Sequence, residues 1–224
     1  MMTQSECRVV VLLSGEGSNL QALLDQAATG TLGGARIVRV ISNRADARGL
    51  QRARDAGIAA TLHPHDDYPE RDKYDADLAR IIAASRADLV VLAGFLRILG
   101  HECVLPYRDR MINIHPSLLP AYRGLHTHRR VLEAREREHG CSVHAVSPEL
   151  DSGPVIIQSR VPVESDDTED TLRARVQREE HRILPATVHW FAAGRLLIRD
   201  DGIMLDGRVL KQPLVLNQGD RLPD

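Results

Sequence analysis

An amide, an imidazole and a carboxylate are the side chains of this sequence whose types and spacing best suit catalysis. Asn113 and His115 stand two apart at the end of the apolar run 111–114, and Asp151 lies in a Gly- and Pro-containing loop. Alternate residues of a strand share a face, so we expect Asn113 and His115 side by side. Asn113 would donate to a developing oxyanion, His115 would handle a proton, and Asp151 would hold the imidazole and stabilise its charged form. Spacing alone also allows purely structural roles for all three: a turn cap, a packed loop histidine and an Asx-turn.

The sequence contains no nucleophile elbow. The pattern Gly-x-Ser-x-Gly, which presents a catalytic serine on a sharp strand-to-helix turn, is absent. A covalent acyl-enzyme is therefore not expected. Direct transfer between two bound substrates is the simpler scheme.

A Gly-rich turn, Ser14-Gly15-Glu16-Gly17-Ser18, separates an apolar run from a helical segment. Glycines let a backbone approach a ligand, and the free N–H groups at a helix start favour an anion. The turn therefore suits a phosphate, although an ordinary strand-to-helix turn has the same pattern. A dinucleotide site is disfavoured, because Leu20 stands where its third glycine would be and Ser42-Asn43-Arg44 follows the second strand in place of an acidic residue.

Two further histidine pairs, His63 with His65 and His126 with His128, have the spacing of potential metal ligands. Neither pair belongs to a known zinc spacing with a third ligand nearby. We expect solvent-facing loop histidines and no metal. The cysteines are odd in number (Cys7, Cys103 and Cys141) and lack CxxC spacing, which suits a reducing compartment.

The elements that must position these residues alternate between strand and helix, as in a doubly wound α/β fold with a mostly parallel sheet. Strands are expected at 9–13, 37–41, 60–62, 88–93, 111–114, 141–146 and 155–163, and helices at 19–28, 47–56, 70–85, 127–138 and 168–193. Two alternating runs within 195–210, around Asp201-Gly202, predict a C-terminal hairpin. Residues beyond Val215 are expected to fray.

The bulk composition favours one domain, with a flexible N-terminus over 1–7, the domain at 8–210 and a C-terminal tail over 211–224. The chain has 224 residues, 43% of them hydrophobic, and its 29 basic and 31 acidic residues leave a net charge of -2. This near balance gives no electrostatic reason to expect nucleic acid or an anionic membrane as a partner. No apolar run approaches the ~20 residues of a membrane span, and the start lacks the features of a signal peptide. A cytoplasmic location is expected.

Five segments together resemble the phosphoribosylglycinamide formyltransferases, which belong to the 10-formyltetrahydrofolate-dependent formyltransferases. The segments are 14–20, 92–99, 113–120, 140–144 and 149–156, and the similarity covers about residues 8–210. The resemblance implies a Rossmann-like formyltransferase fold and transfer of a formyl group from 10-formyltetrahydrofolate to the amine of glycinamide ribonucleotide, in purine biosynthesis. It implies these two small molecules as partners, no metal, and a monomer or homodimer.

The resemblance also assigns residues to roles. It implies that Asn113, His115 and Asp151 are catalytic. The implied ribonucleotide-binding residues are Gly17, Ser18, Asn19, Gln177 and Glu180. The implied folate-binding residues are Arg71, Leu96, Arg97, Ile98, Leu99, Asn113, Ser147, Pro148, Glu149, Leu150 and Asp151. Glu16 would put a carboxylate beside the phosphate, so we expect its side chain to point to solvent.

Three other functions remain open. A formyltetrahydrofolate hydrolase would share the trio and use water as the acceptor, but such enzymes look to carry an additional N-terminal domain. A methionyl-tRNA formyltransferase would need a longer C-terminal domain and a basic surface. A non-catalytic nucleotide-binding module would need the Gly-rich turn and not the trio.

Overall fold

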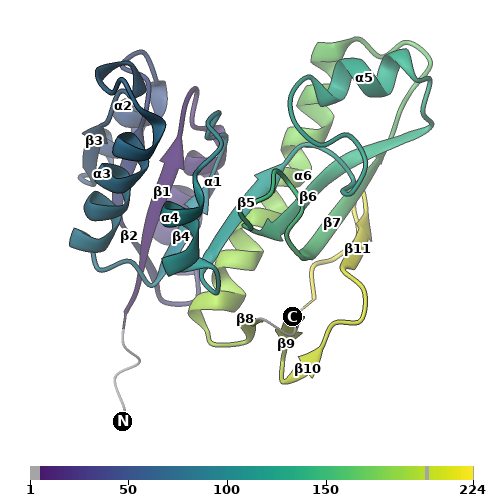
Figure 1. The fold of residues 1–224 in the computed structure, drawn as a ribbon. Coiled ribbons are helices and arrows are strands. Elements are labelled where there is room, and N and C mark those ends of the chain that lie inside the picture. The colour runs from purple at the N-terminus through teal and green to yellow at the C-terminus, as the bar shows by residue number, and fades with distance from the viewer. Residues whose placement is uncertain (1–5, 200–201, 224) are drawn as a thin grey trace.

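A large twisted sheet forms the centre of the computed structural model, which describes residues 6–199 and 202–223 (Figure 1). Its strands are β1 (Cys7–Leu13), β2 (Ala35–Ser42), β3 (Ala59–Leu62), β4 (Leu89–Leu92), β5 (Met111–His115), β6 (Glu138–Ala145), β7 (Val155–Pro162) and β11 (Leu214–Asn217). Their order across the sheet is β11-β7-β6-β5-β4-β1-β2-β3. Only β6 runs antiparallel to its neighbours, and the other neighbouring pairs are parallel. The predicted α/β class with a mostly parallel sheet is confirmed.

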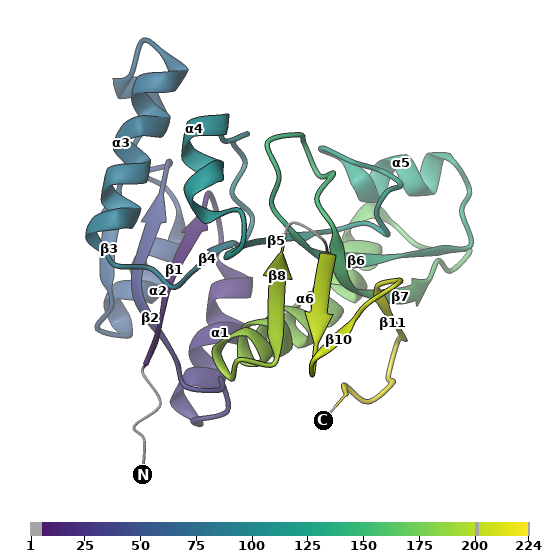
Figure 2. The ribbon, with the colours of Figure 1, turned by 60° about the horizontal axis from the view of Figure 1, so that its bottom comes forward.

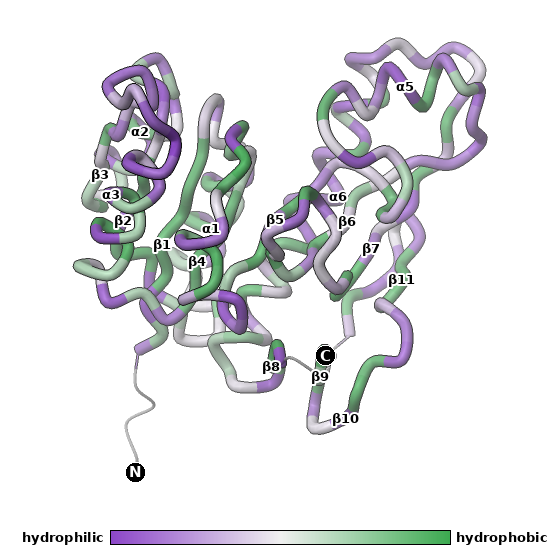
Figure 3. Tube along the Cα trace, viewed as in Figure 1, coloured by the Kyte–Doolittle hydropathy of each residue, from purple (hydrophilic) through white to green (hydrophobic). Residues whose placement is uncertain are grey.

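The central strands are apolar on both faces because both faces are covered. Along β1, Val9, Val11 and Leu13 belong to one hydrophobic core, while Val10 and Leu12 belong to another. The first core packs against α1 (Ser18–Ala28), α2 (Arg48–Asp55) and α6 (Glu169–Ala192). The second packs against α3 (Arg71–Ala84) and α4 (His101–Val104). Figure 3 shows the contrast between the hydrophobic strands and the hydrophilic outer helices. This alternation of buried faces explains the continuous apolar runs in the sequence.

Helix α6 has a well-defined start, which sets the position of the polar residues further along it. The Thr168 side chain accepts a hydrogen bond from the Thr171 backbone at 3.2 Å, and the Thr171 side chain accepts one from the Thr168 backbone at 2.9 Å. Glu169 and Asp170 follow in the first turn, where negative charge complements the helix dipole. The short helix α5 (Thr127–Glu133) packs beside α6.

A second, three-stranded antiparallel sheet lies against α6 (Figure 2). It consists of β8 (Leu196–Arg199), β9 (Gly202–Leu205) and β10 (Arg208–Val209). The predicted hairpin is confirmed as β8 and β9, although its turn residue Asp201 lies outside the described residues. Two short 3-10 turns, His65–Asp67 and Leu105–Tyr107, complete the elements that the structure assigns in its described part.

The helix predicted over 127–138 is wrong in its last turn. Helix α5 ends at Glu133, Arg135 adopts a left-handed φ of 54°, and β6 begins at Glu138. The charged face of this stretch suits a helix, but the pairing of Glu138 with Pro162 across the sheet requires an extended backbone.

The expectation of fraying beyond Val215 is also wrong. Strand β11 pairs in parallel with β7, with Leu216 opposite Ser159 and Asn217 opposite Arg160, and Leu216 is buried. At the other end, Cys7 already belongs to β1, while residues 1–5 lie outside the described part of the chain.

Candidate active site

The candidate site lies at the carboxyl ends of three parallel strands. Because β2 and β3 lie to one side of β1 and β4 and β5 to the other, the strand order reverses at β1. Open α/β sheets bind their ligands outside such a reversal. The segments that leave β1, β4 and β5 here are the Gly-rich turn, residues 93–100 and the loop after His115. Asn19 just after that turn, residues 94–99, the loop after His115, the loop 146–151 and α6 surround a cavity of about 540 Å³, a size typical of small-molecule sites.

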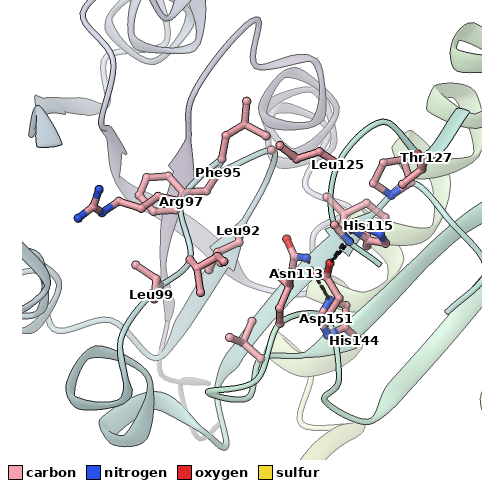
Figure 4. Close-up of a pocket in the computed structure, with 18 of the residues that line it drawn as sticks. Leu92, Phe95, Arg97, Leu99, Asn113, His115, Leu125, Thr127, His144 and Asp151 are labelled. Atoms are coloured by element: carbon pink, nitrogen blue, oxygen red, sulfur yellow. Dashed lines mark hydrogen bonds and ion pairs between the residues drawn. The ribbon is translucent and has the colours of Figure 1, made fainter. Parts of the chain in front are cut away.

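The structure brings the predicted trio together at this cavity (Figure 4). His115 Nδ1 lies 3.6 Å from Asp151 Oδ2. The other ring nitrogen of His115, Nε2, lies 3.0 Å from the Tyr122 carbonyl oxygen, so Nε2–H is the donor. Asp151 Oδ2 also accepts a hydrogen bond from the Gly124 backbone at 2.8 Å, which holds the carboxylate in place.

Asn113 has a partner that sequence reasoning did not identify. The pairing of β5 with β6 sets His144 directly opposite Asn113, and Asn113 Nδ2 lies 3.0 Å from His144 Nε2. His144 Nδ1 lies 2.9 Å from the Ala145 carbonyl oxygen, so Nδ1 carries the proton and Nε2 accepts. Burial lowers the pKa of His144, which keeps the ring neutral. This contact depends on the antiparallel register of β5 and β6, which the sequence alone does not give.

The loop that carries Asp151 is folded tightly onto the end of β6. A Cβ atom at Gly153 would lie 1.9 Å from the Ala145 carbonyl oxygen, so only glycine fits there. Asp151 itself adopts a left-handed φ of 48°. This backbone places Asp151 Oδ1 3.8 Å from His144 Nε2, with Oδ2 facing His115. Four further residues of this loop that were expected to bind folate line the cavity: Ser147, Pro148, Glu149 and Leu150.

Four of the five predicted ribonucleotide-binding residues form two hydrogen-bonded pairs between α1 and α6. Gln177 Nε2 donates to Ser18 Oγ at 2.8 Å, and Asn19 Nδ2 donates to Glu180 Oε2 at 2.8 Å. Burial raises the pKa of the Glu180 carboxyl, which the bond from Asn19 partly opposes. Asn19 and Glu180 line the same cavity as the trio, whereas Ser18 lines an adjacent cavity of about 360 Å³. Asn19 Oδ1 is buried and has no protein partner.

The fifth residue, Gly17, shapes the turn. It adopts a φ of 70°, and a Cβ atom there would lie 2.7 Å from Gly49 Cα. Helix α1 starts at the next residue, and no side chain caps its first N–H groups. The neighbouring Glu16 is exposed and pairs with Arg48 at 3.2 Å, so the expectation that it points to solvent is confirmed.

The opposite wall of the cavity is apolar. Phe95 and Leu99 lie away from the trio in Figure 4, Leu92 is the neighbour of Asn113 in the sheet, and exposed leucine and isoleucine side chains form the rim: Leu96, Ile98, Leu125 and Leu150. Apolar side chains exposed around a cavity are typical of ligand sites. No binding role was predicted from the sequence for Leu92, Phe95 or Leu125. Their contribution depends on which strand ends meet at the cavity.

The two predicted folate-site arginines lie on either side of this wall. Arg97 lines the cavity, and its guanidinium stacks on the Tyr74 ring at 4.3 Å from the centroid. Arg71 does not line the cavity. Instead, Arg71 Nη2 donates to the Ile98 carbonyl oxygen at 2.6 Å, so it supports the wall from behind.

The prediction of solvent-facing histidines is wrong for His63 and His128, which are both buried. His63 stacks on Tyr74 with ring centroids 4.4 Å apart, and His128 Nδ1 lies 3.0 Å from His139 Nε2. Imidazole rings fill apolar space when they are neutral, and burial lowers the pKa of all three histidines. Within residues 6–199 and 202–223, no three His, Cys, Asp or Glu side chains are grouped to hold a metal ion.

Comparisons with known proteins agree with this geometry. Residues 7–188 match the family model described as formyl transferase. The chain is 51% identical over 202 residues to phosphoribosylglycinamide formyltransferase of Escherichia coli (strain K12), covering 90% of this chain and 95% of that protein. It is 40% identical over 199 residues to the trifunctional purine biosynthetic protein adenosine-3 of Homo sapiens, covering 89% of this chain and 20% of that protein.

A solved structure gives the same answer for the fold. Phosphoribosylglycinamide formyltransferase from Coxiella burnetii superimposes with a TM-score of 0.89 at 46% sequence identity, covering 95% of this chain and 100% of that one. The topology of the sheet, the cavity where the strand order reverses and the sequence match over most of the chain all indicate the same family. The chain belongs to the formyl transferase family, among its phosphoribosylglycinamide formyltransferases.

Proposed function

We propose that the cavity holds the two substrates of a formyl transfer and that Asn113, His115 and Asp151 carry out the chemistry between them. The chain transfers a formyl group from 10-formyltetrahydrofolate to the amine of glycinamide ribonucleotide, a step of purine biosynthesis. One observation carries the residue assignments: a single cavity is lined by Asn19 and Glu180 at one side, by the trio, and by an apolar rim.

The ribonucleotide occupies the side of the cavity next to α1 and α6. The uncapped N–H groups at the start of α1 suit its phosphate, because a helix N-terminus favours an anion. The unpartnered Asn19 Oδ1 and the Glu180 carboxyl supply acceptors for hydroxyl groups. Gly17, Ser18 and Gln177 complete this subsite by shaping and supporting the turn.

The folate occupies the apolar side. Leu96, Ile98 and Leu99 present apolar surface to a flat ring, and backbone N–H and C=O groups can then orient it. The loop 147–151 forms the remaining wall, and Arg97 lines the apolar wall with its guanidinium held on the Tyr74 ring. Arg71 acts on this subsite through the Ile98 carbonyl oxygen.

The transfer proceeds by direct attack of the neutral amine on the formyl carbon. A C–N bond forms, and the carbonyl becomes a tetrahedral oxyanion. Asn113 retains one amide N–H beyond the one given to His144, and it donates this N–H to the oxyanion. His115 Nδ1 is the ring nitrogen available to the reaction, because Nε2 is bonded to Tyr122 and the 3.6 Å gap to Asp151 exceeds a direct hydrogen bond. The Asp151 carboxylate faces this nitrogen and stabilises positive charge that develops on the ring during the transfer.

Collapse of the oxyanion breaks the bond between the formyl carbon and the folate nitrogen. The amine loses one proton on becoming a formamide, and the departing folate nitrogen gains one. A water held by Asp151 carries this proton between the two nitrogens. No group outside the two substrates is consumed.

One assay tests this proposal against two of the other functions, a formyltetrahydrofolate hydrolase and a nucleotide-binding module. Labelled 10-formyltetrahydrofolate is mixed with the protein, with and without glycinamide ribonucleotide. Transfer of label only when the amine is present supports the proposal. Release of formate without the amine supports a hydrolase, and the absence of turnover supports a nucleotide-binding module.

We also propose a cytoplasmic location and a monomer or homodimer. All three cysteines lie in the described part of the chain, and each is buried and unpaired, which supports a reducing compartment. Among the helices that the structure describes, none combines the length and the apolarity needed to cross a membrane. Light scattering on the purified protein distinguishes monomer from dimer.

A further inference from the structure

Two buried side chains outside the cavity hold the two ends of the apolar segment 96–99. The Leu96 backbone N–H donates to Ser14 Oγ at 2.8 Å, and the Gly100 backbone N–H donates to Asp75 Oδ2 at 2.7 Å. Neither Ser14 nor Asp75 lines the cavity. We propose that Ser14 and Asp75 are positioning residues that fix this segment for folate recognition. The inference rests on the proposed assignment of residues 96–99 to the folate subsite.

Ser14 fixes the first end from the carboxyl end of β1. Its hydroxyl donates to Asn43 Oδ1 at 2.6 Å. Because a hydroxyl has only one proton, Ser14 Oγ is left as an acceptor, and its lone pair faces the Leu96 N–H. The Ser14 backbone N–H donates to the Gly94 carbonyl oxygen at 2.9 Å, so two bonds join this residue to the start of the segment. Ser14 is also the first residue of the Gly-rich turn, directly after β1. Its hydrogen bonds therefore connect the proposed folate-binding segment to the end of a buried strand.

Asp75 fixes the second end from α3. A Cβ atom at Gly100 would lie 2.6 Å from Asp75 Oδ2, so the glycine allows the backbone to reach the carboxylate. Arg71 Nε lies 3.7 Å from the same oxygen, and Arg71 Nη2 bonds to the Ile98 carbonyl oxygen in the middle of the segment. Burial raises the pKa of the Asp75 carboxyl. Asp75 thus supports the segment both directly and through Arg71.

Packing alone does not hold the middle of the segment. The side chains of Leu96 and Ile98 are 66% and 48% exposed, whereas Ser14 and Asp75 are 3% and 2% exposed. Without these two bonds, the backbone of the segment would sample more conformations, and folate would have to order it on binding. Loss of either hydrogen bond should therefore raise the KM for 10-formyltetrahydrofolate. The ribonucleotide subsite, at α1 and α6, should be affected far less.

The test compares Ser14→Ala and Asp75→Ala with Ser85→Ala. Ser85 is a close control, because it is 4% exposed, its hydroxyl donates to the Ile81 carbonyl oxygen at 2.9 Å and it accepts from Arg39 Nε at 2.8 Å, away from the cavity. Ser14→Ala and Asp75→Ala should each raise the KM for 10-formyltetrahydrofolate about tenfold, since each leaves a backbone N–H without its acceptor. The ribonucleotide KM should stay within about twofold of the parent value in all three variants. Asp75→Asn, which keeps an acceptor oxygen for Gly100 but loses the charge facing Arg71, should raise the folate KM less than Asp75→Ala does.

Thermal unfolding of each variant separates positioning from general stability. If Ser14→Ala and Asp75→Ala lower the unfolding midpoint as Ser85→Ala does but leave the folate KM unchanged, the inference is wrong. Equal rises in both KM values would also overturn it. Calorimetric titration with 5-formyltetrahydrofolate, an unreactive isomer, gives the folate affinity directly for any variant with low turnover.

Ile98→Asp distinguishes a failure of this inference from a failure of the subsite assignment. If Ile98→Asp raises the folate KM and Ser14→Ala does not, the assignment stands and the positioning role falls. If Ile98→Asp leaves the folate KM unchanged, segment 96–99 does not bind folate and both fail together.

Discussion

The Asn113 amide donates one N–H to Nε2 of His144, the residue directly opposite on the neighbouring antiparallel strand, at 3.0 Å. The Ala145 carbonyl oxygen holds the His144 proton on Nδ1, so the direction of the bond from Asn113 is fixed. The side-chain amide therefore cannot rotate freely, and its second N–H has a fixed direction before substrate binds. A donor that needs no reorganisation stabilises an oxyanion most effectively.

Replacing Asn113 by alanine should reduce kcat by about 100-fold or more, because loss of one oxyanion donor costs ~2.7–4 kcal/mol in other enzymes. Folding should be intact, as judged by circular dichroism and thermal unfolding. Asn217→Ala, a change on the edge strand β11, is the control and should leave kcat unchanged. A loss of less than threefold in Asn113→Ala would refute the role.

Replacing Asp151 by asparagine keeps an oxygen for the Gly124 N–H and removes the negative charge beside His115. Positive charge that develops on the His115 ring during the transfer then has no carboxylate facing it at 3.6 Å. The kcat should therefore fall by about 100-fold, while both KM values change little. Steady-state kinetics with each substrate varied in turn test this, and a loss of less than threefold would count against the pairing of Asp151 with His115.

The double variant Ser18→Ala, Asn19→Ala should raise the KM for the ribonucleotide and spare the KM for folate. It removes the Ser18 acceptor of Gln177 and the Asn19 donor to Glu180, so both supports between α1 and α6 are lost. Steady-state kinetics with each substrate varied in turn provide the measurement. The opposite pattern would mean that the two subsites are assigned the wrong way round.

Gly17→Ala should destabilise the protein and weaken ribonucleotide binding, whereas Gly15→Ala should be tolerated. Gly17 has a φ of 70° and lies against Gly49, while a Cβ atom at Gly15 meets no atom within 4 Å. The backbone strain at Gly17 is expected to cost about 1–3 kcal/mol. Urea unfolding and the ribonucleotide KM are the two readouts. Equal unfolding midpoints for the two variants would show that the turn relaxes without cost.

The buried pair His128 and His139 should make the fold less stable as pH falls below 7. Burial lowers the pKa of both rings from the ordinary value of 6.5, so the unfolded chain takes up protons at a higher pH than the folded chain does. The free energy of unfolding is therefore highest above the pKa that these histidines have in the unfolded chain. It decreases between about pH 6.5 and pH 5, by at least about 1 kcal/mol.

Urea unfolding at pH 7 and pH 5 measures this effect. His139→Gln should reduce the difference between the two pH values, because it removes one titrating ring. The control is His101→Gln, at an exposed position on α4, which should leave the difference as it is. An equal difference in His139→Gln and the parent protein would contradict the prediction.

Local patterns along the chain determined the fold class and the main chemical groups. The alternation of Val9 to Leu13 between two cores appears in the sequence as one apolar run, and the end of that run locates the Gly-rich turn. The spacing of Asn113 and His115 likewise follows from the two-residue repeat of a strand. These features depend on neighbours in the chain, so they could be predicted without knowing the rest of the molecule.

Contacts between distant segments were decided only by the tertiary structure. His144 meets Asn113 because β6 runs antiparallel to β5, and a shift of one residue would have turned a different side chain toward it. The burial of His63, the pairing of β11 with β7 and the bond from Leu96 to Ser14 join residues far apart in sequence. Their energies depend on which surfaces the whole sheet brings together, and no local repeat in the sequence encodes that arrangement.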